Sequence, residues 1–498
     1  MGYQAHSDVV HHPPVTSKCQ SAIVAEPESD SPSPSTRQIP VPPSDEFSVP
    51  SVASSSYPER GGNSVNPLVD GEVAFREICR AVEAAEASVW VTVTFLWEAF
   101  RMPDARGTFF DVLDSAAARG LDVRVVFWRP DAVTAGLKTN AFWGSPEQLA
   151  FLDARRPSIK IRWDRARHGC CQHQKSWLVD AGSAGEVAFV GGINQNPHSV
   201  VMPEHRGRQQ NHDIYAELRG PSVADVHHNF VQRWNDASES DQSLGHWGRG
   251  AERDIDFPTA VGRPSGTSIV QVQRTLAEGR HPAIPPAGGN LAVDTFSGER
   301  SILDQYLQAI DAATSTIYLE NQYLEDPSVV DSLHKALDRG VEVAIVLPGE
   351  PVLPGRSQDD VTRSEFHRRR ASLSDYPQFI AVGLAGLDDD DQRQHVYVHA
   401  KVMLIDDEWG TIGSANLHWF SLYGNAEMNV SFWDAKKARE LRCQLLHEHL
   451  GIEVHELTDS SSLRLLADVA KSNAGIWRRG SSAWQGNAFA LDLVNYGR

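Results

Sequence analysis

The sequence predicts an α/β protein made of two similar α/β/α-sandwich lobes, related by internal duplication, with the active site at the interface between the lobes. Two observations predict this fold. Segments with helical spacing of apolar residues alternate with β-branched runs typical of strands. The alternation also runs in the same order through both halves of the chain. A length of 498 residues, 41% of them hydrophobic, suffices for two such cores.

The first part of the chain offers little material for a core. Residues 1–65 are rich in Ser and Pro, as in SPSPSTRQIPVPPSDEFSVP. Apolar side chains are too sparse there to offset the entropy cost of ordering, so we expect a disordered tail. The start of the chain has no signal-peptide pattern, and no apolar run approaches the ~20 residues that span a bilayer. We therefore expect a cytoplasmic protein, with any membrane contact peripheral.

Each half then presents the same series of helices and strands. Residues 69–97 and 296–324 each predict a helix followed by a strand, and Asp70 is expected to cap the first of these helices. Residues 109–130 and 329–350 each predict a helix that ends at a glycine and leads into a buried strand. The repeated order favours two lobes with a mixed or parallel sheet in each.

Composition changes set the expected boundaries of the lobes. We expect the first lobe to cover residues 66–240 and the second to cover residues 291–456. The Gly- and Pro-rich residues 241–290 are expected to connect them, and residues 457–498 form a C-terminal extension with one short helix.

A sparse pattern of His, Lys and Asp occurs once in each half. Residues 173–180 read HQKSWLVD, and residues 399–406 read HAKVMLID. Side chains two apart on a strand face the same way, so each His should point with its Lys: His173 with Lys175, and His399 with Lys401. An imidazole can act as nucleophile or proton carrier near neutral pH, and a Lys offers positive charge to an anionic substrate.

The last residue of each pattern is an acid, Asp180 or Asp406. Both complete the motifs and are grouped with the catalytic residues, although their odd-numbered offset from the His turns them to the other face of a regular strand. We therefore expect a structural or indirect orienting role for them. Each motif is followed by a Gly-rich turn that ends in an Asn, Asn194 or Asn416, whose amide can hydrogen-bond a phosphoryl oxygen.

Two further carboxylates, Asp213 and Glu427, occupy matching places after these turns. A carboxylate bonded to one imidazole nitrogen fixes the tautomer and directs the other nitrogen to the substrate. Two His, two Lys and two Asn around one cavity predict a phosphodiester site that stabilises phosphoryl oxygens without a metal or cofactor. One His attacks phosphorus while the other protonates the leaving oxygen.

Within residues 66–455, these paired motifs resemble those of the phospholipase D superfamily. AFVGGIN (188–194) is similar to phosphatidylcholine-hydrolysing members and IYLENQYL (317–324) to the eukaryotic type, while YVHAKVMLIDDEWGTIGSANL (397–417) and NAEMNV are similar to the cardiolipin synthase branch. The chain departs from the family at LHWFS (417–421), where many members carry a charged residue and an Arg. The resemblance implies His173 as nucleophile, through a phosphohistidine, and His399 as general acid.

Several functions therefore remain open at this point. The first expectation is a phospholipase D-type enzyme that hydrolyses or transphosphatidylates glycerophospholipids such as phosphatidylcholine to phosphatidic acid. Alternatives are a cardiolipin synthase-like phosphatidyltransferase, a nuclease or other phosphodiesterase, and a scaffold with a silent site. The formal charge of −19 disfavours nucleic acid as a partner. We expect a monomer with a phospholipid substrate, and we expect histidine pairs such as His227-His228 to lie on the surface.

Overall fold

The computed structural model describes most of both halves of the chain. It covers residues 48–52, 57–130, 142, 144–155, 158–237, 254–281, 284–289, 297–351 and 360–497, apart from the side chains of residues 360–362. Within these ranges, every helix is too short or too polar to cross a lipid bilayer.

The first half forms a mixed sheet of six strands. Parallel pairing joins β3 to β2 and to β4, whereas β2–β5, β5–β6 and β6–β8 are antiparallel. Side by side, the strands are β4 (Ile159–Arg165), β3 (Asp122–Arg129), β2 (Ser88–Val93), β5 (Ser176–Val179), β6 (Val187–Gly191) and β8 (Ile214–Arg219).

The second half repeats this arrangement strand for strand. Parallel pairing again joins β12 to β11 and to β13, and the other neighbours are antiparallel. The order is β13 (Phe379–Leu387), β12 (Glu342–Val346), β11 (Thr316–Asn321), β15 (Lys401–Ile405), β16 (Trp409–Gly413) and β17 (Glu427–Trp433). The predicted duplicated α/β architecture is therefore confirmed. In addition, β14 (Arg393–Val398) and β18 (Ala488–Ala490) pair with β13.

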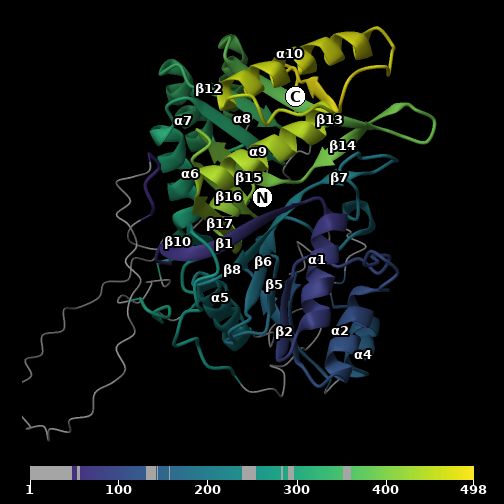
Figure 1. Cartoon of the computed structure of the whole chain (residues 1–498), viewed down its shortest axis with the longest axis vertical. Coiled ribbons are helices and arrows are strands. Elements are labelled where there is room, and N and C mark those ends of the chain that lie inside the picture. The colour runs from purple at the N-terminus through teal and green to yellow at the C-terminus, as the bar shows by residue number, and fades with distance from the viewer. Residues whose placement is uncertain are drawn as a thin grey trace, which may run out of the picture. The chain divides into compact units, whose positions relative to one another are not determined.

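Two long strands join the halves into one sheet. β1 (Arg60–Val69) pairs with β8 and with β9 (Ser268–Leu276), and β9 pairs with β17. Figure 1 shows β1 crossing between the elements of the two halves.

Both strands correct the expected boundaries. β1 begins inside the segment expected to be a disordered tail, where Val49 and Tyr57 are also fully buried, and β9 lies inside the expected linker. The many turn-forming residues around these strands led to that interpretation, but SIVQVQRTL contains the alternation Val-Gln-Val-Gln, which is typical of a strand. Residues 1–47 and 53–56 of the predicted tail lie outside the described residues.

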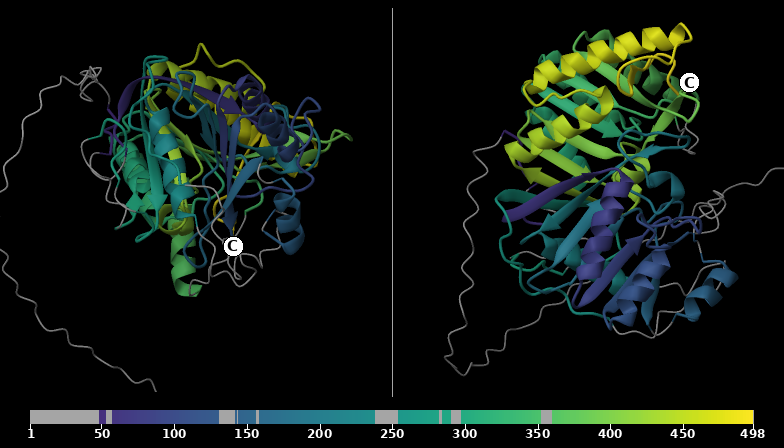
Figure 2. Two further views of the ribbon diagram at one scale, coloured as in Figure 1. Left: turned by 90° about the horizontal axis from the view of Figure 1, so that it is seen from below. Right: turned by 45° about the vertical axis from the view of Figure 1, so that its right-hand side comes forward.

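Helices cover the strands of each half. Side chains of α1 and α2 share one core with the first sheet, those of α6 and α7 share another with the second sheet, and those of α5, α9 and α10 meet in a third core that spans both halves. Figure 2 shows α9 and α10 along the strands of the second half. The helices are α1 (Gly71–Ala84), α2 (Phe109–Ala118), α4 (Pro146–Asp153), α5 (Val223–Asp236), α6 (Ser301–Ala312), α7 (Pro327–Asp338), α8 (Asp360–Ala371), α9 (Ala435–Leu450) and α10 (Asp459–Arg478).

The helix ends of the repeat follow the sequence expectation. α2 and α7 stop just before Gly120 and Gly340, whose φ angles are 85° and 93°. A residue without a Cβ is favoured there, because side chains clash with the backbone in this left-handed region. After α2 and after α7 the backbone can then turn directly into the next parallel strand, β3 or β12.

Candidate active site

The first His-x-Lys motif lies just before β5, and the second leads into β15, whose first residue is Lys401; at both places each half meets the other. The backbone N–H of His173 donates to the carbonyl of Ala426 (2.8 Å), and that of His399 donates to the carbonyl of His212 (2.8 Å). The second contact extends the parallel pairing of β14 with β7 (Asn211–His212). Each motif is thus held in place by backbone of the opposite half.

The orienting carboxylates cross between the halves in the same way. Nδ1 of His173 lies 2.9 Å from Oε2 of Glu427, and Nδ1 of His399 lies 2.6 Å from Oδ2 of Asp213. Donation from Nδ1–H leaves Nε2 of each ring as the available nucleophile or base. Burial lowers the pKa of His173, with Glu427 opposing, and burial together with Lys401 lowers the pKa of His399 to about 4. Burial therefore favours the neutral form of both rings.

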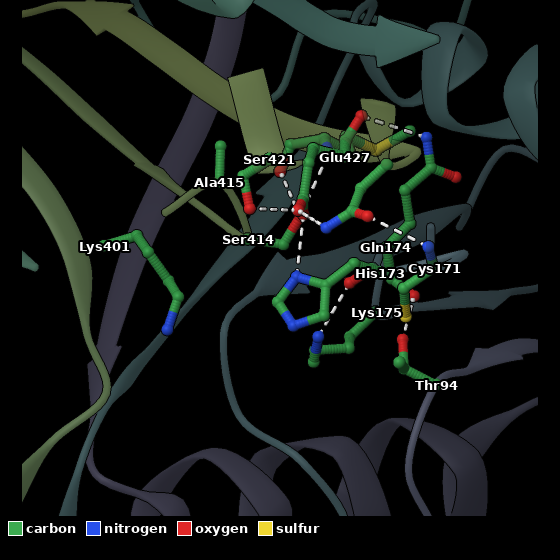
Figure 3. A network of polar contacts seen from close by, with 12 residues as sticks. Thr94, Cys171, His173, Gln174, Lys175, Lys401, Ser414, Ala415, Ser421 and Glu427 are labelled. Carbon is green, nitrogen blue, oxygen red and sulfur yellow. Dashed lines mark hydrogen bonds and ion pairs between the residues drawn. The ribbon is translucent and has the colours of Figure 1, made fainter. Parts of the chain in front are cut away.

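Glu427 is the centre of a dense hydrogen-bond network (Figure 3). Its carboxylate accepts from the hydroxyls of Ser414 and Ser421, both at 2.6 Å, and from Nδ2 of Asn425 at 3.3 Å. Burial opposes ionisation, but His173, its hydrogen bond, Lys175 and Ser414 together lower the pKa of Glu427. The partner of His173 is therefore a fixed negative charge.

The matching acid of the first half has a different surrounding. Asp213 stands where the second half has Glu427, and Gly192 stands where it has Ser414. A Cβ at Gly192 would lie 2.3 Å from Oδ1 of Asp213, so the carboxylate occupies the space of a serine side chain. That oxygen instead accepts from the backbone N–H of Ile214 (2.8 Å). The two halves of the site are related but unequal.

The two motif lysines are buried beside the histidines. Nζ of Lys175 donates to the carbonyl of His173 (2.7 Å), and Nζ of Lys401 donates to that of His399. Burial, with carboxylates opposing, lowers the pKa of Lys175 to about 8 and that of Lys401 to about 7. In Figure 3 Lys401 extends toward His173, and it also lowers the pKa of that ring. Cationic groups from both motifs thus converge on one place, which suits an anionic ligand.

Asp180 and Asp406 lie at the other end of the motif strands, where each turns with a positive φ, 56° and 54°. The carboxylate of Asp180 accepts from the backbone N–H groups of residues 86–88, and that of Asp406 accepts from those of residues 314–316. Both acids therefore fix the entry to β2 or β11. These contacts fit the expected structural role and do not support their grouping with the catalytic side chains.

Asn194 and Asn416 end the turns after β6 and β16, at equivalent positions. Both are buried, and Oδ1 of each has no hydrogen-bond partner in the structure. Because the oxygen and nitrogen of an amide exchange places on rotation, each position can present an Nδ2–H donor to an oxygen of a ligand. Unsatisfied buried amides at both turns are the arrangement that a phosphate would complete.

A third histidine near these groups escaped the sequence interpretation. His418 follows Asn416 by two residues, is buried, and packs against the ring of Tyr323 at 4.6 Å. Its Nδ1 accepts from the backbone N–H of Ser421 (3.2 Å), so the neutral ring carries its proton on Nε2. Burial lowers its pKa to about 4, with His173 contributing. In the repeat His418 occupies the position of Asn196. This difference between the two halves was the feature of the sequence that could have drawn attention to His418.

Two family models match the chain. The model described as "Phospholipase D" matches residues 194–336, and the model described as "Cardiolipin synthase, PLD-like domain" matches residues 306–448. The first His-x-Lys motif precedes both matches, while the second lies within the latter. With the duplicated fold and the paired motifs, these matches define the class: the chain belongs to the phospholipase D superfamily, whose members act on phosphodiester bonds.

Individual relatives are distant and carry different names. A cardiolipin synthase of Listeria innocua is 22% identical over 398 residues, which cover 78% of this chain and 69% of that protein. Phospholipase D A of Dictyostelium discoideum is 24% identical over 456 residues, which cover 76% of this chain and 33% of that protein. The predicted family is thus confirmed, at a level that does not separate hydrolysis from transfer.

One solved structure supports the fold. The phosphatidylserine synthase of Haemophilus influenzae Rd KW20 aligns over 83% of this chain and 94% of its own, with a TM-score of 0.52 and 13% identity.

Proposed function

We propose that the protein is a phospholipase D-type enzyme that cleaves glycerophospholipids such as phosphatidylcholine to phosphatidic acid. The observation that supports this proposal most strongly is the pair of neutral, carboxylate-bonded histidines flanked by two buried lysines. The lysines and the two turn asparagines hold the phosphoryl oxygens, and binding of the phosphate anion favours their charged form.

In the proposed mechanism Nε2 of His173 attacks phosphorus and forms a phosphohistidine. For this step His399 is protonated on Nε2 as well as on Nδ1, a form that Asp213 and the bound phosphate anion favour. The bond from phosphorus to the headgroup oxygen breaks, and the Nε2 proton of His399 goes to that oxygen. Water or an alcohol then attacks phosphorus, gives its proton to His399 and breaks the P–N bond. We assign His173 as nucleophile because Glu427, with its additional donors, is suited to stabilise the positive charge of the phosphorylated ring.

An apolar cavity beside the site supports a lipid substrate. Its volume is about 600 Å³, and its lining includes Leu96 and Trp97, which lie a few residues after β2, together with several phenylalanines. Leu96 bridges to Gln195, the neighbour of Asn194. An acyl chain could therefore enter this cavity while the phosphate lies at the asparagine turns.

A cardiolipin synthase-like phosphatidyltransferase is the second candidate, favoured by the family model over residues 306–448. Both reactions share the first step and differ in the acceptor, which is water in one case and the hydroxyl of a phospholipid in the other. Acceptor choice is therefore the property to measure.

The test incubates the protein with phosphatidylcholine vesicles and a small primary alcohol, and separately with phosphatidylglycerol vesicles, and identifies products by mass spectrometry. Phosphatidic acid with phosphatidyl-alcohol is expected, and His173→Ala and His399→Ala should each abolish both. His227→Gln is the matched control. The expected surface position of His227 and His228 is wrong, because both side chains are buried; Nδ1 of His227 lies 2.9 Å from Oε1 of Glu186, outside the site. Cardiolipin as the main product would favour the second candidate, and turnover that survives both alanine variants would refute the mechanism.

A further inference from the structure

A second cluster of histidines and carboxylates lies next to the backbone of Asp213, between β7 and β8. Asp70, His205, His212 and Glu448 each offer one ligand atom, and these four atoms lie within 4.8 Å of one another. Asp70 precedes α1, His205 lies in the loop before β7, and His212 ends β7. Glu448 comes from the last turn of α9, so the cluster joins the two halves of the chain.

The contacts in this cluster exceed what hydrogen bonds can satisfy. Nδ1 of His212 lies 3.1 Å from Asp70 Oδ1 and 2.9 Å from Glu448 Oε1. Nε2 of His205 lies 2.8 Å from Glu448 Oε1 and 3.4 Å from Asp70 Oδ2. Each ring nitrogen carries at most one proton, which can serve one of its two carboxylate contacts well. A cation between the four residues would serve all of them.

Two carboxylate oxygens in the cluster make no hydrogen bond in the structure. Oδ2 of Asp70 and Oε2 of Glu448 make no hydrogen bond, although their side chains are 0% and 3% exposed. A buried carboxylate oxygen without a partner is costly, so a ligand for it is expected.

The backbone at Asp70 also departs from the sequence expectation. Asp70 occupies the expected N-cap position of α1, but its side chain makes no cap hydrogen bond. Its φ of 65° and ψ of 153° fall in a region of backbone conformation used almost only by glycine. The contacts of its carboxylate in the cluster offset the strain of this conformation. That carboxylate points to His212 instead of to the helix.

The outer contacts of His212 follow the pattern of a metal-bound histidine. Its second nitrogen, Nε2, lies 2.8 Å from Oε2 of Glu320. Glu320 in turn accepts from Nε2 of His449 (2.9 Å) and from the hydroxyl of Tyr318 (2.5 Å). A carboxylate on the second nitrogen orients a ligating imidazole and strengthens it as a ligand.

We propose that Asp70, His205, His212 and Glu448 form a closed structural site for a divalent transition-metal ion, zinc(II) in the first place. Two neutral imidazoles and two carboxylates balance a charge of +2, and this ligand set suits zinc. Zinc–ligand bonds of about 2.0–2.1 Å place tetrahedral ligand atoms about 3.3 Å apart, close to the contacts in the cluster.

The site is distinct from the reaction centre but adjacent to it. Oδ1 of Asp70 also accepts the backbone N–H of Asp213 (3.3 Å), and the carbonyl of His212 accepts the N–H of His399. The ion therefore fixes the backbone that presents Asp213 to His399 and ties α9 to the first half. Its expected role is stability and alignment, with no part in bond cleavage.

The decisive experiment measures zinc in the full-length protein by elemental mass spectrometry, before and after stripping with a strong chelator. About one zinc per chain is expected, with a lower melting temperature after stripping that added Zn²⁺ restores. Co²⁺ added to the stripped protein should give the intense visible absorption of a four-coordinate site. Stripped wild-type protein that stays folded and binds neither Zn²⁺ nor Co²⁺ would overturn the proposal.

Variants locate the ion in the cluster. His205→Gln and Glu448→Gln should lose the bound zinc, whereas His227→Gln, a buried histidine in another part of the fold, should keep it. Glu320→Gln, which leaves the four proposed ligands in place but alters the contact to Nε2 of His212, should weaken Zn²⁺ binding about 10- to 100-fold. Circular dichroism checks folding, and if one ligand variant fails to fold, the other and the wild-type titration still decide. Full zinc content in a folded His205→Gln or Glu448→Gln protein would refute the assignment.

Discussion

Replacement of Glu427 by Gln tests the proposed role of the crossed carboxylates most directly. The substitution keeps the size of the side chain but removes the negative charge that faces Nδ1 of His173 at 2.9 Å. Glutamine also brings an NH2 group toward hydroxyls that now donate to the carboxylate, those of Ser414 and Ser421. The imidazole then loses both its fixed tautomer and the charge that stabilises its phosphorylated form.

The magnitude follows from the burial of the pair. Glu427 is fully buried, and removing one partner of a buried, hydrogen-bonded charge pair costs about 3–5 kcal/mol. If most of this loss is felt in the transition state, kcat falls about 10²- to 10⁴-fold. Ser421→Ala removes one donor to Glu427 and leaves the carboxylate on His173, so about 1.5 kcal/mol, or about tenfold, is expected.

The assay measures kcat with phosphatidylcholine vesicles and with the water-soluble diester bis(4-nitrophenyl) phosphate. Folding of each variant is checked by circular dichroism and thermal unfolding, because a buried substitution also lowers stability. Glu427→Gln with kcat within about threefold of the wild type, while folded, would refute the argument that this carboxylate acts on His173.

Four further predictions concern other parts of the molecule. The kcat/KM of the wild type should fall as the pH rises through about 7–8, because the two lysines lose their charge there: the pKa of Lys401 is lowered to about 7 and that of Lys175 to about 8. A plateau of kcat/KM up to pH 10 would contradict this. The folded protein holds fewer protons on Lys401 than the unfolded chain between pH 7 and 10.5, so this group should make the free energy of unfolding, followed by urea titration, rise with pH over that range. Asp406→Asn and Asp180→Asn should each lower the free energy of unfolding by about 2–4 kcal/mol through weakened bonds to backbone amides, with little change in kcat of the folded protein, and a large loss of kcat at unchanged stability would show a catalytic role instead. His418→Gln should reduce kcat about tenfold through loss of a buried imidazole that interacts electrostatically with His173, and unchanged kinetics would exclude its participation.

Local patterns in the sequence predicted much of the fold. The helix ends before Gly120 and Gly340 and the shared face of each His-x-Lys pair depend only on residues a few positions apart. The missed strands show the limit of composition as a guide. β1 and β9 are flanked by Gly, Pro and Ser, and their place at the centre of the sheet depends on pairing with β8 and β17.

The candidate site shows the same division between local and distant information. By itself the sequence determined that a His-Lys-Asn constellation occurs twice in a duplicated α/β chain, since repeat order and period-two spacing are properties of neighbouring residues. Only the tertiary structure decided that Glu427 meets His173 while Asp213 meets His399, because that crossing follows from how the halves pack. The cluster around His212 likewise draws ligands from Asp70 to Glu448, and no spacing rule links residues that only folding brings within a few ångströms.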